Sequence, residues 1–133
     1  LGDTVGNTLI TPTKIYVKPV LEVLKTVDVK GMVHVTGGGF IENIPRVLPE
    51  GLGANINLGT WDMPKVFSYI DAEGGIDTKE LYKTFNMGIG FIMIVKEHEV
   101  ETLLKAVENV NEKAFVIGNV KTGEGVELCQ SVK

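Results

Sequence analysis

The sequence predicts a single α/β (α+β) domain, with a mixed β-sheet and helices packed mainly on one face of that sheet. The chain has 133 residues, of which 44% are hydrophobic and 23% are charged, and this composition suits one globular domain with its own core. Helical and strand patterns of apolar residues alternate along the chain, which is typical of layered α/β structures. No repeat or low-complexity linker interrupts residues 1–133, so one domain is expected.

The first half of the chain is predicted to hold two helices and two strands. Thr11 is expected to cap a helix that starts at Pro12, because the first helical turn does not use the N–H group that Pro lacks. Apolar residues continue at helical spacing as far as Val27, and Pro19 is expected to bend this helix. The segments that follow are predicted as two strands and a helix: Val29–Thr36, Gly53–Leu58 and Met63–Ala72.

The second half is predicted to hold two helices and three strands. Asp77 is expected to cap a short helix that ends near Phe85. The apolar run Ile89–Val95 is typical of a strand buried on both faces, so it is placed at the centre of the sheet. The spacing of apolar residues over Glu97–Asn111 predicts an amphipathic helix. A hairpin-like TGEG turn joins the last two predicted strands, Ala114–Lys121 and Gly125–Val132.

The composition argues against nucleic acids and membranes as partners. The net charge is −4, whereas duplexes and anionic membranes bind clustered Lys and Arg side chains. A small phosphorylated ligand stays compatible with this charge. Cys129 is the only cysteine in the sequence, so no internal disulfide is expected and a cytoplasmic location is favoured. The longest apolar run, Phe91–Val95, is too short to cross a bilayer, and Leu1 in place of Met indicates a part of a longer protein.

Three consecutive glycines, Gly37–Gly39, follow the predicted strand that contains His34. Glycines at this point can bring backbone amides close to an anion, because no Cβ blocks the approach and the first amides of a helix lack internal partners. Thr36 adds a hydroxyl group. The alternative is a tight turn whose residues need positive φ angles. The stretch matches neither the dinucleotide fingerprint nor the Walker A pattern.

Three longer segments carry a family resemblance. They read GDT…LITPTKIYVKPVLEVLK, HVTGGGFIENIPRVLP and LYKTFNMGIGF. In this order and at this spacing they resemble the C-terminal domain of the aminoimidazole ribonucleotide synthetase (phosphoribosylformylglycinamidine cyclo-ligase) family, over nearly the whole chain. The resemblance implies the fold of that superfamily's C-terminal domain. It also implies an ATP-dependent ring closure in purine biosynthesis, in which ATP activates the formamide oxygen of phosphoribosylformylglycinamidine before ring closure releases ADP and phosphate.

The resemblance also implies partners. In this family an N-terminal domain largely holds ATP and magnesium, and the enzyme works as a homodimer. The isolated chain is therefore expected to be inactive, and no metal ligand is predicted within it. Two alternatives stay open: a related ATP-using protein of the thiamine monophosphate kinase or selenophosphate synthetase type, and a noncatalytic domain for phosphate binding or assembly.

The candidate site residues follow from the glycine stretch and the resemblance together. His34 is the catalytic candidate, because an imidazole changes charge near neutral pH; the alternative is a structural strand residue. Substrate or phosphate binding is expected at six positions: Thr36, Gly37, Gly38, Gly39, Asn43 and Asn86. For the two asparagines the alternative is a purely local role, as a turn cap or in loop geometry.

Overall fold

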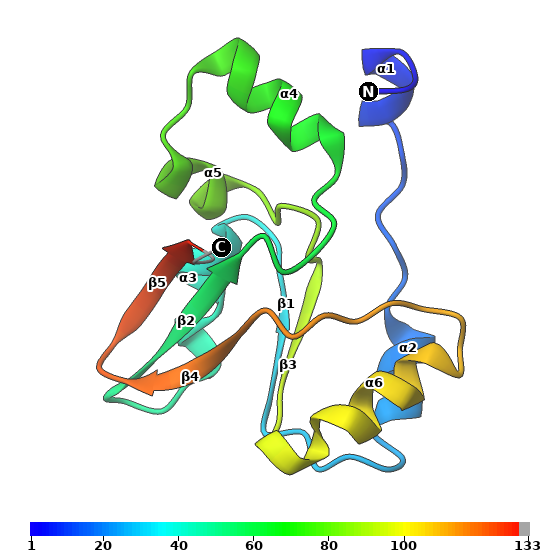
Figure 1. Ribbon diagram of the computed structural model, residues 1–133, viewed down its shortest axis with the longest axis vertical. Coiled ribbons are helices and arrows are strands. Elements are labelled where there is room, and N and C mark those ends of the chain that lie inside the picture. Colours follow the sequence, from blue (N-terminus) through cyan, green and yellow to red (C-terminus); the bar gives the residue numbers. More distant parts are fainter. Residues whose placement is uncertain (131–133) are drawn as a thin grey trace.

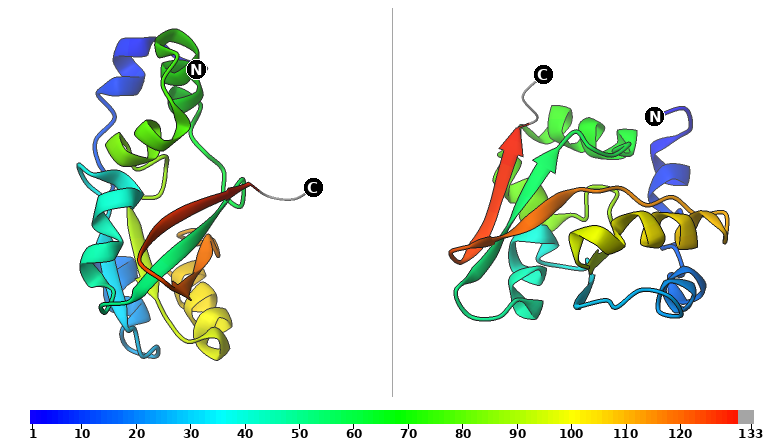
Figure 2. Two further views of the ribbon diagram at one scale, coloured as in Figure 1. Left: turned by 90° about the vertical axis from the view of Figure 1, so that its left-hand side faces the viewer. Right: turned by 60° about the horizontal axis from the view of Figure 1, so that its bottom comes forward.

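The computed structural model describes residues 1–130 as an α+β domain with five strands in mixed arrangement (Figure 1), which confirms the predicted class. One sheet pairs β1 (Gly31–His34) with β3 (Phe91–Ile94) in antiparallel register. The other has the order β4-β2-β5 and contains Gly118–Thr122, Leu52–Leu58 and Gly125–Gln130. Helices lie at both ends of the molecule, with the strands between them (Figure 2).

The prediction that Ile89–Val95 forms a central strand was wrong. Within residues 1–130, β3 pairs with β1 alone and belongs to a sheet of two strands. Both edges of β2 are already occupied, by β4 on one side and β5 on the other, so β2 has no free edge for β3. The apolar run instead contributes to the packing between the sheets and the helices, which a sequence pattern does not distinguish from a central position.

The predicted hairpin between the last two strands was also wrong. β4 runs antiparallel to β2 and β5 runs parallel to it, so β2 lies between them. The connecting turn crosses over Gly53, where a Cβ atom would lie 2.3 Å from the carbonyl oxygens of Gly123 and Gly125. The missing side chain at Gly53 therefore makes this crossing possible. Positions 131 and 132 of the last predicted strand lie outside the described residues.

The N-terminal helix differs from its prediction. α2 covers only Val17–Val23, and Thr11 caps no helix because the chain from residue 11 to 16 is not helical. Pro19 explains the late start, since it falls in the first turn of α2, where its missing N–H is not needed. A short helix that the sequence analysis missed, α1 (Val5–Leu9), is capped by the Thr4 hydroxyl.

The other three predicted helices lie close to their predicted positions, whereas α3 (Gly39–Asn43) was not predicted. α5 (Thr78–Thr84) begins at the predicted cap, where the Asp77 carboxylate accepts a hydrogen bond from the Lys79 amide at 2.9 Å. The predicted amphipathic helix is shorter than expected and packs against α2. The other bounds are α4 (Lys65–Gly74), α6 (Val100–Glu108) and the 3-10 turns η1 (Pro45–Val47) and η2 (Glu97–Glu99).

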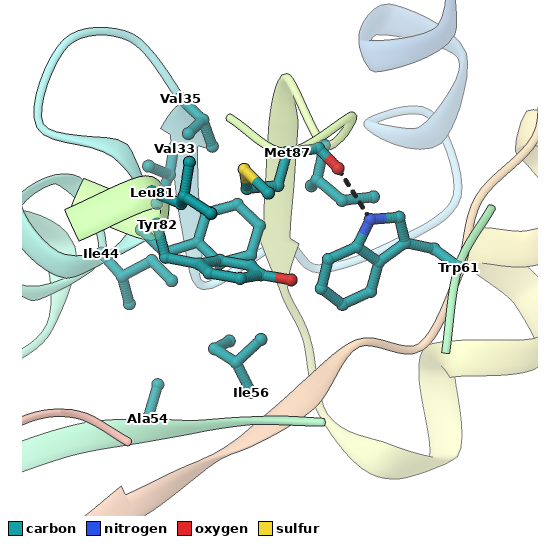
Figure 3. Close-up of a cluster of buried hydrophobic side chains, with 11 residues drawn as sticks. Val33, Val35, Ile44, Ala54, Ile56, Trp61, Leu81, Tyr82 and Met87 are labelled. Carbon is teal, nitrogen blue, oxygen red and sulfur yellow. Dashed lines mark hydrogen bonds between the residues drawn. The ribbon is translucent and has the colours of Figure 1, made fainter. Parts of the chain in front are cut away.

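The main hydrophobic core joins α3, α5 and the faces of both sheets (Figure 3). Phe40 is fully buried there, and its ring lies 5.5 Å from that of Tyr82 and 5.9 Å from that of Trp61. The Trp61 indole N–H donates a 2.9 Å hydrogen bond to the Met87 carbonyl oxygen. A smaller core holds α2 against α6. The glycine turn therefore leads into α3, and Phe40, the second residue of that helix, anchors it in the main core.

Candidate functional site

The glycine turn links the end of β1 to α3. The Val35 amide still donates to the Gly90 carbonyl oxygen at 2.9 Å, and the Gly39 amide then donates to the Thr36 carbonyl oxygen at 3.0 Å, which closes the turn. Gly38 has φ +101° and Gly39 has φ +53°. Both values lie in the region that favours glycine, so the predicted tight turn with positive φ angles is present.

The three glycines have different surroundings. A Cβ atom at Gly39 would lie 2.1 Å from the Tyr82 carbonyl oxygen, and one at Gly38 would lie 2.9 Å from the Glu42 Cβ. A Cβ atom at Gly37 would have no heavy atom within 4 Å. Gly37 is exposed, and its φ is not positive. The packing of this chain therefore explains why positions 38 and 39 are glycine but does not explain position 37.

The Asn43 side chain closes the turn from inside. It is 5% exposed, and its Nδ2 group donates to the carbonyl oxygens of Gly39 at 2.8 Å and of Thr36 and Gly37 at 3.2 Å each. Its Oδ1 atom accepts from an Nη1 group of Arg46 at 3.1 Å. Asn43 thus lies at the predicted site, with both ends of its amide engaged by protein groups.

Three charged side chains surround the turn. The Glu42 carboxylate lies 3.8 Å from an Arg46 guanidinium nitrogen and 3.9 Å from the Lys83 ammonium, and all three side chains are exposed enough to move. Glu42 and Arg46 follow the turn in sequence, but Lys83 comes from α5. No sequence pattern links Lys83 to the turn, because only the packing of α3 against α5 brings it here.

The other predicted residues lie around this turn or in a neighbouring loop. His34 is exposed on the face of β1 opposite to the buried Val33, with its ring 5.9 Å from that of Tyr16 and 6.2 Å from that of Phe91. Thr36 is exposed at the start of the turn. Asn86 lies in the loop before β3, where its Oδ1 atom accepts from the Gly88 amide at 2.9 Å. That bond fits the loop role that the sequence analysis left open.

Other features of residues 1–130 lie apart from this turn. No three His, Cys, Asp or Glu side chains come together there in a way that would hold a metal ion. In the same part of the chain no helix has the length and apolar character that crossing a membrane requires. An apolar groove of about 380 Å³ lies between β3, α6 and residues 112–120, and none of the predicted site residues lines it.

Comparison with known proteins gives the family. A family model described as AIR synthase related protein, C-terminal domain, matches residues 2–129. The chain belongs to this family. The resemblance predicted from the glycine stretch and its flanking segments is therefore confirmed. The family model describes a C-terminal domain, and residues 2–129 correspond to that domain.

Three relatives of this AIR synthase family member are named phosphoribosylformylglycinamidine cyclo-ligase. A protein of Bacillus licheniformis is 52% identical over 121 residues, which is 91% of this chain and 35% of that protein. One of Alkaliphilus metalliredigens is 52% identical over 131 residues, or 98% of this chain and 38% of that protein. One of Caldanaerobacter subterraneus is 55% identical over 125 residues, which is 94% of this chain and 37% of that protein. The chain thus spans little more than a third of the length of these relatives.

Proposed function

We propose that this chain is the C-terminal domain of a phosphoribosylformylglycinamidine cyclo-ligase of purine biosynthesis. The observation that supports this most strongly is the 55% identity to a relative of that name over 94% of the chain. The proposed reaction of the whole protein converts phosphoribosylformylglycinamidine into aminoimidazole ribonucleotide and consumes ATP. A domain for assembly alone would give no reason for an open glycine at position 37.

The part of this reaction that we assign to the chain is phosphate binding at the glycine turn. The amides of Gly37 and Gly38 have no hydrogen-bond acceptor within residues 1–130, and the open side of Gly37 leaves room for close approach. Backbone amides of this kind bind phosphate oxygens without a formal positive charge. The phosphate would be the ribose 5-phosphate of the substrate or the phosphoryl group that is transferred.

His34 and Thr36 are proposed to face the same ligand. They alternate with the buried Val33 and Val35 at the end of β1 and just after it, so their side chains are expected to point to the same side. The imidazole would exchange a proton with the substrate, and the Thr36 hydroxyl would donate to a phosphate oxygen. Asn86 is proposed to shape the neighbouring loop and to present its amide nitrogen to the substrate.

ATP and magnesium are proposed to be bound mainly by another part of the longer protein. The donor set at the turn does not fit magnesium, because its nearest carboxylate, Glu42, stands alone between Arg46 and Lys83 and magnesium prefers several oxygen ligands in octahedral geometry. We therefore assign no step through magnesium to residues 1–130. An N-terminal domain and a homodimer are the proposed partners.

The test uses the full-length protein that contains this domain, with the substitution Gly37→Val. A β-branched side chain at the open position blocks close approach of an anion without adding charge. We expect kcat/KM for the cyclo-ligase reaction to fall at least about tenfold, because an interaction with the reacting ligand is lost. Gly6→Val is the matched control, since Gly6 is equally open but lies in α1. Full activity in the Gly37→Val enzyme would overturn the phosphate role of the turn.

A further inference from the structure

We propose that Asn43 is a positioning residue that turns the backbone amides of the glycine turn outward, toward a phosphate group. This proposal rests on the phosphate-binding function proposed above, and it names the residue that orients the backbone amides for that function. Asn43 does not need to touch the ligand for this role, because its side-chain amide is already engaged with the backbone and with Arg46. It acts through the peptide units of the turn.

The argument starts from the planarity of the peptide bond. The carbonyl and the N–H of one trans peptide unit point in opposite directions, and the described residues contain no cis peptide bond. The carbonyl of Thr36 shares its unit with the amide of Gly37, and the carbonyl of Gly37 shares its unit with the amide of Gly38. Asn43 Nδ2 binds both of these carbonyl oxygens. The two amides therefore point away from Asn43.

Neither of these two amides has an acceptor in residues 1–130. By contrast, the Gly39 amide donates to the Thr36 carbonyl oxygen. The carbonyl in the same peptide unit belongs to Gly38, and Asn43 does not bind it. The side chain of Asn43 thus binds the carbonyls whose partner amides are free. That coincidence is what a device for presenting amides to an anion requires.

Asparagine suits this task for a chemical reason. The three carbonyl oxygens of the turn accept hydrogen bonds only, so they require the NH₂ end of the side chain. Arg46 donates only, so it requires the oxygen end. Arg46 therefore fixes the orientation of the Asn43 amide, and an aspartate of the same shape would keep the Arg46 contact while facing three carbonyl oxygens with negative charge.

The test compares backbone NMR signals of the 133-residue chain with and without inorganic phosphate. Asn43→Asp should shift the ligand-free amide signals of Gly37 and Gly38 and weaken phosphate binding at least tenfold. Asn43→Ser keeps one hydrogen-bond donor and adds no charge, so it should give an intermediate phosphate affinity. It replaces Asn43→Asp as the test if the Asp variant does not fold. Asn119→Asp is the matched control, because it makes the same change of charge at an exposed residue of β4 that takes no part in the turn.

A second control separates positioning from stability. Val107→Ala truncates a buried side chain of the smaller core between α2 and α6, away from the turn, and it should lower stability without changing phosphate affinity. If Asn43→Asp and Asn43→Ser leave the signals of the turn and the affinity unchanged, the role of Asn43 is overturned. If the unsubstituted chain binds no phosphate while the Asn43 variants still shift the turn, the proposed phosphate function fails and the effect of Asn43 on the turn stands.

Discussion

Gly39 approaches the backbone of Tyr82 so closely that a Cβ atom at position 39 would lie 2.1 Å from the Tyr82 carbonyl oxygen. The same atom would lie 2.9 Å from the Phe85 carbonyl oxygen. Both carbonyls belong to the C-terminal end of α5, which cannot retreat because Leu81 and Tyr82 are anchored in the main core. The glycine turn is therefore held in place by α5 (Thr78–Thr84), which is far from it in the sequence.

Gly39→Ala should destabilise the protein strongly, and Gly37→Ala should not. Alanine at position 39 adds an overlap with backbone atoms and a left-handed φ, which together cost about 2–5 kcal/mol. Alanine at position 37 meets open space and should change the free energy of unfolding by less than about 0.5 kcal/mol. Denaturant titration of both variants measures the difference. Equal stability of the two variants would contradict the close packing of Gly39.

A substitution at Gly38 tests phosphate binding less cleanly than one at Gly37. The sequence alone favours Gly38→Val as a substitution that tests phosphate binding while the fold persists. In the structure Gly38 has φ +101°, and an added Cβ would lie 2.9 Å from the Glu42 Cβ. Valine there would strain the turn itself, so a loss of binding would not separate ligand contact from conformation. Position 37 separates the two effects.

Trp61→Phe should lower the free energy of unfolding by about 1–3 kcal/mol. The indole N–H of Trp61 is the donor for the buried Met87 carbonyl oxygen, and a buried acceptor left without its partner costs about this much. Far-UV circular dichroism under denaturant is the appropriate probe, because the substitution removes the only tryptophan of the chain. A variant as stable as the unsubstituted protein would mean that water replaces the indole at this carbonyl.

Local signals in the sequence predicted several elements correctly. The Asp77 cap and the alternation around Ala54 and Ile56 are properties of short segments, and α5 and β2 formed where these signals placed them. The hairpin and the central strand were wrong because strand pairing depends on which edges of β2 are free. No local pattern carries that information.

The candidate site shows the same limit. The glycine stretch was visible in the sequence, but the difference between Gly37 and Gly39 arises from contacts with α5. The role of Asn43 also could not be read from residue type, because it depends on which carbonyls its side chain reaches. Lys83 joined the surroundings of the turn only through the packing of two helices.

Stability should fall at high pH through Tyr82. Burial raises the pKa of the Tyr82 phenol above its ordinary value of 10.0, so the folded state favours the neutral form. A raised pKa contributes stability that is fully present below the unfolded pKa and is lost as pH rises through the folded value. Measurements of unfolding from about pH 8 to about pH 11 should show this decline.

Tyr82→Phe is the control for this pH effect. It keeps the buried ring but removes the titrating hydroxyl, so the decline at high pH should become smaller. A residual decline is expected, because burial also raises the pKa of Tyr16. An identical pH dependence in the two proteins would show that Tyr82 does not titrate differently in the folded and unfolded states.

His34→Gln should separate a catalytic from a structural role. His34 is exposed, so the substitution should change the free energy of unfolding by less than about 0.5 kcal/mol. If the imidazole transfers a proton, kcat of the full-length enzyme should fall by roughly 10²-fold or more, the usual scale of general acid–base catalysis. Lost stability with normal turnover of the folded enzyme would instead assign His34 to packing against Tyr16 and Phe91.

The 133-residue chain alone should fold cooperatively but should not catalyse ring closure. Its main core and its smaller core between α2 and α6 are both built from its own residues, so one unfolding transition is expected. Phosphoryl transfer also requires ATP phosphates and metal ions aligned with the acceptor, and residues 1–130 bring together no carboxylate cluster for such an ion. We therefore expect phosphate binding without ATP-dependent turnover, and recovery of turnover when the rest of the protein is restored. Turnover by the purified 133-residue chain at the rate of the full-length enzyme would show that the whole active site lies within this domain.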